Sequence, residues 1–196
     1  TVWLIDNLES LVKKWWSIYL DSLYVADTYT LWQLGKSSLW SLAFYGKQTQ
    51  NKKLITQVIE IISTRFKELI QTENIDAVCF APTSIKRQVQ IMDLMKQKLH
   101  NNKSIIFLDK YFPWEIVAQK TLKWDLARNK NANNTIFPRS WQKWYSKVLL
   151  ADDFIGSGAT LNISAKKLKE SWLATTVIGF AIVGNMDLSY EVISEV

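Results

Sequence analysis

Two adjacent carboxylates, Asp152 and Asp153, stand between an apolar run and a turn of small residues. The apolar run, 148–151, has the length of a buried strand, and the turn, 155–160, contains two glycines. A helical pattern begins after the turn, so the N–H groups and partial positive charge of a helix N-terminus would point into it. The turn therefore predicts a phosphate site, and the carboxylates predict a pair of hydrogen-bond acceptors beside it.

A ligand that carries a diol next to a phosphate reconciles the acid pair with the phosphate-binding turn. The carboxylates of Asp152 and Asp153 would accept hydrogen bonds from the hydroxyls, while the turn would take the phosphate. Ribose 5-phosphate has this arrangement. A Mg²⁺ ion could bridge hydroxyls and further phosphates, held by the two carboxylates or only through the substrate.

Other motifs fit this segment less well. A Walker A loop needs a lysine after its last glycine, where this chain has Ala159. A dinucleotide-binding fingerprint needs a third glycine, where Leu161 stands. A plain strand-ending turn with a helix cap is the remaining alternative, but it does not explain two adjacent acids directly before the small residues.

Strand and helix patterns alternate in the second part of the chain, which predicts an α/β fold with a parallel sheet flanked by helices. Strands are expected at 77–81, 104–108, 147–151 and 175–183, with a possible fifth at 190–193. Helical stripes are expected at 85–99 and 161–172. Ligands of such sheets bind at the carboxyl ends of the strands, where Pro82 and the acid pair fall.

The first 74 residues are expected to form a helical N-terminal hood, distinct from an α/β core of residues 75–196. Helical stripes are expected there at 8–18, 32–45 and 54–70. Within the core, the basic segment 109–146 shows no clear periodicity. We expect it to be a long irregular loop that is functional or mobile.

Composition limits the class of protein. The 196 residues are 48% hydrophobic and 21% charged, which is typical of a soluble globular chain. No apolar run reaches the roughly 18–20 residues that span a bilayer, and no signal peptide is indicated, so a cytoplasmic protein without membrane contact is expected. With one cysteine (Cys79) and one histidine (His100), the chain can form neither an internal disulfide nor a Cys/His zinc cluster. A net charge of +6 favours polyanionic partners, nucleic acid included, and some of the ten tryptophans could stack on bases.

The segment 148–160 resembles the phosphoribosyl pyrophosphate (PRPP) motif of type I phosphoribosyltransferases, in which an apolar strand, two acids and two apolar residues precede a Ser/Thr-Gly-x-Thr loop. Phe154 is bulkier than usual in that motif, and Gly156 stands where Thr or Ser is more common. Further segments are similar to the competence-associated ComF-like branch of the family: Trp40–Lys47, the helix 52–70, Pro82 with Lys86 and Arg87, the residues Gln119, Leu122, Arg128, Asn131 and Phe137, and the end 191–196. Relatives in that branch often carry an N-terminal zinc ribbon, which this chain does not show.

The resemblance implies a glycosyltransferase of nucleotide metabolism, in which a nitrogenous base or amine displaces pyrophosphate from PRPP in the presence of Mg²⁺. Asp152 and Asp153 would hold the ribose hydroxyls, with Asp153 and Arg128 as the catalytic residues. The 5-phosphate would be bound by Ile155, Gly156, Ser157, Gly158, Ala159 and Thr160. The pyrophosphate would face Pro82, Thr83, Ser84, Lys86 and Arg87, and the loop 119–135 would close over it.

Three functions stay open at this point. The first is a phosphoribosyltransferase, and the second is a non-catalytic sensor that binds PRPP or a nucleotide. The third is a competence-associated DNA-uptake protein that uses the basic surface and the aromatic residues. A homodimer is compatible with each of them.

Overall fold

The computed structural model describes residues 4–15, 17–29, 35–83, 85–111 and 125–184. Within these ranges a six-stranded sheet has the order β1-β2-β8-β7-β3-β4, and all its neighbours are parallel except β1 and β2. The strands are β1 (Ile5–Asp6), β2 (Ser22–Thr28), β3 (Ala77–Phe80), β4 (Ser104–Ile106), β5 (Leu108–Lys110), β6 (Ile136–Pro138), β7 (Tyr145–Phe154) and β8 (Ala174–Gly184). The helices are α1 (Leu8–Val12), α2 (Ser38–Thr49), α3 (Lys52–Thr72), α4 (Ile91–Leu99), α5 (Asp125–Thr135) and α6 (Ala159–Glu170).

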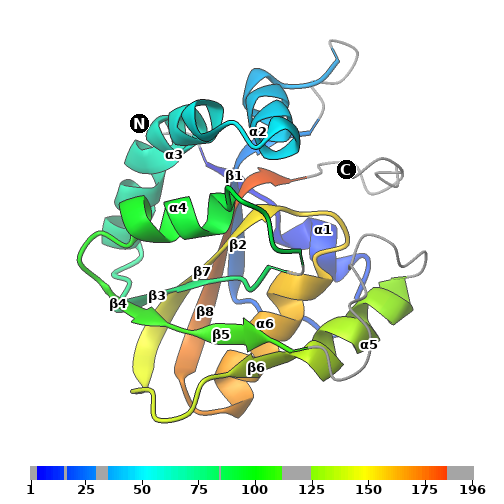
Figure 1. Ribbon diagram of the computed structural model, residues 1–196. Coiled ribbons are helices and arrows are strands. Elements are labelled where there is room, and N and C mark those ends of the chain that lie inside the picture. The colour runs from blue at the N-terminus through cyan, green and yellow to red at the C-terminus, as the bar shows by residue number, and fades with distance from the viewer. Residues whose placement is uncertain (1–3, 16, 30–34, 84, 112–124, 185–196) are drawn as a thin grey trace.

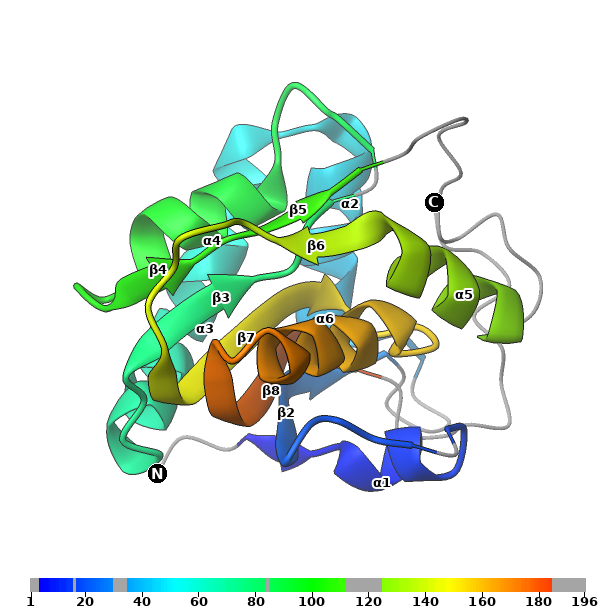
Figure 2. The ribbon, with the colours of Figure 1, turned by 90° about the horizontal axis from the view of Figure 1, so that it is seen from below.

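Helices cover both faces of the sheet, as Figures 1 and 2 show. Side chains alternate along the central strand β7, so that Leu149 and Ala151 join the core under α2, α3 and α4. Val148 and Leu150 join the second core, on the face of α1 and α6. This arrangement confirms the prediction of an α/β fold with a mostly parallel sheet flanked by helices.

The α/β part follows the sequence pattern with two differences. Strand β7 does not end before the acid pair but runs through it to Phe154. Helix α4 begins at Ile91 rather than near 85, because the Val89 amide donates to Gln50 Oε1 (3.3 Å) and Gln90 has an extended backbone. His100 is the C-cap of this helix, as expected of a helix terminus. The possible strand at 190–193 lies outside the described residues.

The expectation that the first 74 residues are all helical is wrong for their first third. The stripe expected at 8–18 forms only the short helix α1, and Trp15 and Ile18 reach the core from a non-helical backbone. The following segment is strand β2, which pairs with β8 in parallel register. The helix expected at 32–45 is α2, Ser38–Thr49, which begins after Ser37 because the Ser37 Oγ accepts the Trp40 amide (3.0 Å); residues 32–34 lie outside the described ranges. The helix expected at 52–70 is α3. The division at residue 74 stays a prediction.

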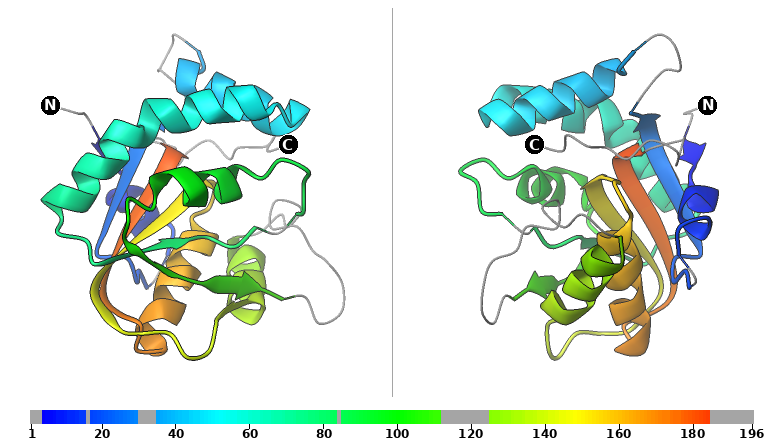
Figure 3. Two further views of the ribbon diagram at one scale, coloured as in Figure 1. Left: turned by 60° about the vertical axis from the view of Figure 1, so that its left-hand side comes forward. Right: turned by 90° about the vertical axis from the view of Figure 1, so that its right-hand side faces the viewer.

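The segment 109–146 is not wholly irregular. Strands β5 and β6 form an antiparallel ribbon, and the polar run before β6 forms α5, which packs against α6. Figure 3 shows this ribbon and helix beside the main sheet. Ala132 and Ile136 are buried there, which ties the polar helix to the core. Residues 112–124 lie outside the described ranges.

No helix in the described ranges is long and apolar enough to cross a membrane.

Candidate functional site

The acid pair lies at the carboxyl end of the central strand β7, between β8 and β3. One oxygen of each carboxylate accepts the amide of the next residue: Asp153 N–H donates to Asp152 Oδ1, and Phe154 N–H donates to Asp153 Oδ1, both at 2.8 Å. These bonds orient both side chains. The position agrees with the general location of ligands in parallel sheets.

Two lysines from different elements act on this acid pair. Lys47, near the end of α2, places its Nζ 2.6 Å from Asp153 Oδ2 and 4.8 Å from the centre of the Phe154 ring. Lys110, at the end of β5, attracts the Asp152 carboxylate electrostatically. Neither lysine belongs to the sequence motif around the acid pair. Lys47 lies at the end of a predicted helical segment, and no local pattern indicates where such a side chain points.

The environment brings the pKa values of Asp152 and Lys110 close to neutral pH. Burial and the neighbouring Asp153 carboxylate raise the pKa of Asp152 to about 7, although the Asp153 amide, Lys47 and Lys110 act in the opposite direction. Burial lowers the pKa of Lys110 to about 8, against the attraction of Asp152. Groups that titrate near neutral pH are concentrated at functional sites. This end of β7 is therefore a candidate site on electrostatic grounds as well as by position.

The turn that follows is supported by the N-terminal segment. Gly158 has φ +75°, and a Cβ there would lie 2.1 Å from Leu11 Cδ2. The indole N–H of Trp15 donates to Ser157 O at 2.9 Å. Only glycine fits the position, because both the positive φ and the contact with Leu11 exclude a side chain. The predicted small-residue turn is thus packed against Leu11 and Trp15, and these contacts fix its backbone.

The N-terminus of α6 opens toward the acid pair's end of the sheet. The Ala159 amide donates to the Ser157 hydroxyl at 3.4 Å. The first backbone-to-backbone hydrogen bond to this turn is that of the Asn162 amide, to Gly158 O at 2.9 Å, so the amides of Thr160 and Leu161 precede the helical ladder. Of the predicted phosphate-binding residues, Gly156 and Thr160 are half-buried. The other four are buried: Ile155, Ser157, Gly158 and Ala159. An anion would therefore meet the turn at Gly156 and Thr160.

Only part of the predicted pyrophosphate set is brought to the acid pair. The Ala81 amide donates to Ala151 O (2.8 Å), so Pro82 and Thr83 follow β3 alongside the end of β7. Lys86 is exposed and Arg87 half-buried in the segment before α4, and their role toward the pyrophosphate stays a prediction. Ser84 lies outside the described residues. Arg128 belongs to α5, but its side chain is not in the described part, so its predicted role stays a prediction.

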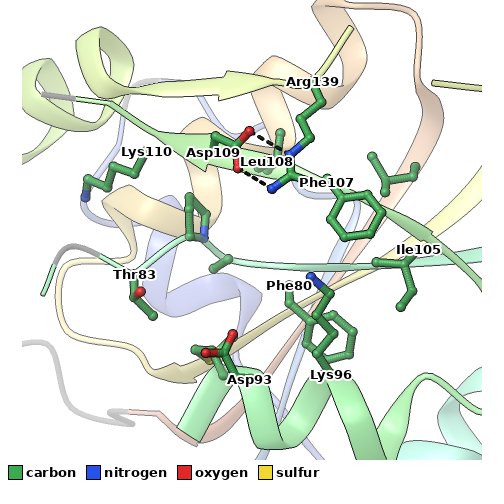
Figure 4. A pocket seen from close by; sticks show the side chains of 14 residues that line it. Phe80, Thr83, Asp93, Lys96, Ile105, Phe107, Leu108, Asp109, Lys110 and Arg139 are labelled. Atoms are coloured by element: carbon green, nitrogen blue, oxygen red, sulfur yellow. Dashed lines mark hydrogen bonds and ion pairs between the residues drawn. The ribbon is translucent and has the colours of Figure 1, made fainter. Parts of the chain in front are cut away.

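A pocket of about 230 Å³ lies between α4 and β5 (Figure 4), and its wall includes Lys110, the lysine that acts on Asp152. Pro82, Thr83 and Lys110 belong to its wall. The other lining residues are Phe80, Ala81, Met92, Asp93, Lys96, Ile105, Ile106, Phe107, Leu108, Asp109 and Arg139. The pocket thus extends the candidate site from β3 toward the sheet edge.

One wall of the pocket is held by a two-pronged ion pair. Arg139 donates from Nε and Nη2 to the carboxylate of Asp109, at 2.7 and 2.8 Å, and these bonds hold the pKa of Asp109 below its usual value. Lys96 Nζ and Arg139 Cζ also lie 4.2 and 4.7 Å from the centre of the Phe107 ring. The wall is therefore polar.

The acid pair is a poor site for a resident metal ion. In the part of the chain that the structure describes, no group of three or more His, Cys, Asp or Glu residues is placed to hold a metal. On the acid pair, each Oδ1 accepts an amide and Asp153 Oδ2 contacts Lys47. Mg²⁺ prefers to keep waters and to bind through substrate phosphates together with one or two carboxylates. These residues fit an ion that arrives with a phosphorylated substrate better than one held by the protein.

Comparison with protein-family models and with curated proteins finds no match for this chain.

Proposed function

We propose that this chain binds PRPP and transfers its phosphoribosyl group to a nitrogenous base or amine, with release of pyrophosphate. The observation that supports the proposal most is the position of Asp152 and Asp153. They lie at the carboxyl end of the central strand, shortly before the turn into α6. Acceptors for a diol and donors for a phosphate would therefore lie at the same end of the sheet. A type I phosphoribosyltransferase-like fold is part of the same proposal.

Each part of the ligand has candidate partners. Asp152 and Asp153 accept hydrogen bonds from the ribose hydroxyls, and the turn 155–160 takes the 5-phosphate. Pro82, Thr83 and Lys110, which belong to the wall of the pocket, face the pyrophosphate. Lys86, Arg87 and Arg128 are further cations for the pyrophosphate.

The proposed reaction requires mainly electrostatic stabilisation and positioning of the reactants. The bond from C1 to the pyrophosphate oxygen breaks, and its electron pair leaves with pyrophosphate. A nitrogen lone pair forms the new bond to C1, and the nitrogen then loses a proton to solvent. Positive charge develops on the ribose, which the carboxylates of the acid pair offset, while Lys110 stabilises the leaving group. Mg²⁺ enters as part of the substrate, bound to its phosphates.

The test of this proposal is calorimetry with Mg²⁺–PRPP and with ribose 5-phosphate, on the native chain and on Asp153→Asn. A ligand at about 100 times its Kd should raise the free energy of unfolding by about 2.7 kcal/mol. Asp153→Asn should weaken binding by about 1–3 kcal/mol, because an amide is a weaker acceptor than a carboxylate. Circular dichroism controls for folding. Native protein that binds neither ligand would refute the proposal.

A screen for pyrophosphate release across bases and amines separates an enzyme from a sensor. Release with one acceptor establishes the transferase. Tight binding of PRPP without release from any acceptor would favour the non-catalytic sensor.

A second candidate function, nucleic-acid binding, is favoured by a separate observation. Trp141, Trp144 and Trp172 are exposed in the turns before β7 and β8, and Trp144 Nε1 donates to Thr175 Oγ1. This is the opposite end of β7 from the acid pair, roughly 25 Å away along the strand at about 3.3 Å per residue. Exposed aromatic rings on a basic protein can stack on single-stranded bases. Trp141→Ala with Trp172→Ala should then abolish oligonucleotide binding, whereas Asp153→Asn should leave it unchanged or slightly stronger.

A further inference from the structure

Lys47 is held in place by the junction between α2 and α3. Helix α2 ends at Gln50 in the left-handed conformation, and the Asn51 amide donates to Gly46 O at 3.0 Å. Gly46 lies against α3, since a Cβ there would be 3.1 Å from Ile55 Cγ1. The backbone that carries Lys47 is thus packed tightly, and the side chain reaches the acid pair from a fixed origin.

The Lys47 ammonium completes the set of contacts that orient Asp153. The Phe154 amide engages Oδ1, and Lys47 Nζ engages Oδ2 at 2.6 Å. Both partners of this ion pair are largely shielded from solvent, with side-chain exposures of 27% for Lys47 and 13% for Asp153. Contacts to both oxygens fix the plane of the carboxylate. Each oxygen can still accept a second hydrogen bond, so acceptor capacity remains for a ligand.

The same junction also contacts the other side of the candidate site. Gln50 Oε1 accepts the amide of Val89, in the segment between β3 and α4. The end of α2 therefore connects the acid pair to the segment that carries Lys86 and Arg87. A single rigid junction holds both parts in their relative positions.

We propose that Lys47 is a positioning residue for the ribose diol: by fixing the Asp153 carboxylate, it makes the end of α2 a determinant of selectivity for ribose over 2-deoxyribose. The inference rests on the proposed function, because it names the residue that orients one of the diol acceptors. Lys47 acts through Asp153. It follows that the N-terminal helices belong to the sugar site and do more than cover it.

The test compares ribose 5-phosphate with 2-deoxyribose 5-phosphate by calorimetry, on the full chain and on Lys47→Met. The deoxy sugar lacks one hydroxyl of the diol, so the ratio of the two affinities reports how well the diol is recognised. Lys47→Met should weaken the affinity for ribose 5-phosphate by about tenfold and leave the affinity for 2-deoxyribose 5-phosphate almost unchanged. The ratio of the two affinities would then approach one. Lys47→Arg should keep the native ratio. Lys53→Met, an exposed lysine at the start of α3, is the control for charge.

Two outcomes would overturn the proposal. An equal loss for both sugars would mean that Lys47 acts on the phosphate or on the fold. An unchanged or tighter affinity for ribose 5-phosphate would mean that the ion pair only competes with the ligand.

A measurement without ligand keeps the two proposals separate. Hydrogen exchange of the Phe154 amide, which donates to Asp153 Oδ1, should be faster in Lys47→Met and unchanged in Lys53→Met. Unchanged exchange in Lys47→Met would refute the positioning role, whatever the protein binds. If native protein binds no sugar phosphate, the proposed function and the selectivity for ribose both fail. The exchange rate then still decides whether Lys47 orients Asp153.

Discussion

The indole N–H of Trp15 donates to the backbone carbonyl of Ser157 at 2.9 Å, so a residue near the start of the chain holds the turn that follows the acid pair. Both groups are buried. A buried carbonyl without a hydrogen-bond donor destabilises the folded state, and Trp15 supplies a donor to the Ser157 carbonyl.

Trp15→Phe should therefore destabilise the protein by about 1–2 kcal/mol, since it removes the donor and keeps most of the ring. Urea unfolding monitored by circular dichroism measures the change. Trp172→Phe is the matched control, because Trp172 is 83% exposed and should change stability little. Equal stability of the Trp15→Phe and native proteins would show that the turn does not depend on this hydrogen bond.

Gly158→Ala should destabilise the protein more than Gly35→Ala does. Both glycines have positive φ, +75° and +89°, so alanine is strained at either position. At Gly158 the new Cβ would also meet Leu11, whereas none of the residues that the structure describes lies within 4 Å of a Cβ at Gly35. The difference isolates the packing term, which we expect to be about 1–3 kcal/mol.

Leu11→Ala should recover part of the packing loss in the Gly158→Ala protein, although it creates a cavity of its own. A double-mutant cycle on these two positions measures their coupling. Additive effects would mean that Leu11 does not pack against the turn.

The local parts of the site could be predicted from the sequence, because they are contiguous. The apolar run before Asp152 and Asp153, the small-residue turn and the start of α6 all fall within 148–161, although β7 runs through the acid pair rather than ending before it. Each depends on short-range preferences: apolar residues for a buried strand, and glycine for a positive φ.

The parts that depend on distant contacts could not be predicted. Strand β2 is stabilised by β8, more than a hundred residues later, and its own residues give no clear strand signal beside the preceding helical stripe. Helix α5 is mostly polar, and its own Ala132 is buried in the core that it shares with α6. Lys47 and Lys110 reach the acid pair only through the packing of α2 and the β5–β6 ribbon. No short-range pattern records such contacts.

Asp152→Asn should stabilise the folded protein more at about pH 8 than at about pH 5. An unfolded Asp titrates near 3.9, whereas in the folded protein the pKa of Asp152 is raised to about 7. Between these values the folded protein keeps a proton that the unfolded chain has lost. Asp152 therefore lowers stability progressively as pH rises toward about 7, and its effect is constant above that pH. Asparagine carries no charge and removes this loss.

Thermal unfolding of the native and Asp152→Asn proteins across this pH range measures the effect. The difference in Tm should grow as pH rises and then level off. A pH-independent difference would mean that Asp152 titrates near its ordinary pKa in the folded state. The lower stability of the native protein at neutral pH would be a cost of keeping two adjacent carboxylates at a functional site.

Lys110→Met should weaken the binding of Mg²⁺–PRPP more than the binding of ribose 5-phosphate, in contrast to the effect expected of Lys47→Met. Lys110 lines the pocket beside Thr83, where the proposed function places the pyrophosphate, and ribose 5-phosphate has no group there. Loss of a charge-assisted hydrogen bond to pyrophosphate corresponds to about 1.5–3 kcal/mol, or at least a tenfold change in Kd. Lys98→Met, an exposed lysine on α4, controls for the change in net charge. Isothermal titration of both ligands gives the two ratios directly. A Lys110→Met protein that loses ribose 5-phosphate as strongly as PRPP would show that Lys110 acts through Asp152 on the sugar, and the pyrophosphate would then have to be bound elsewhere than at the wall of this pocket.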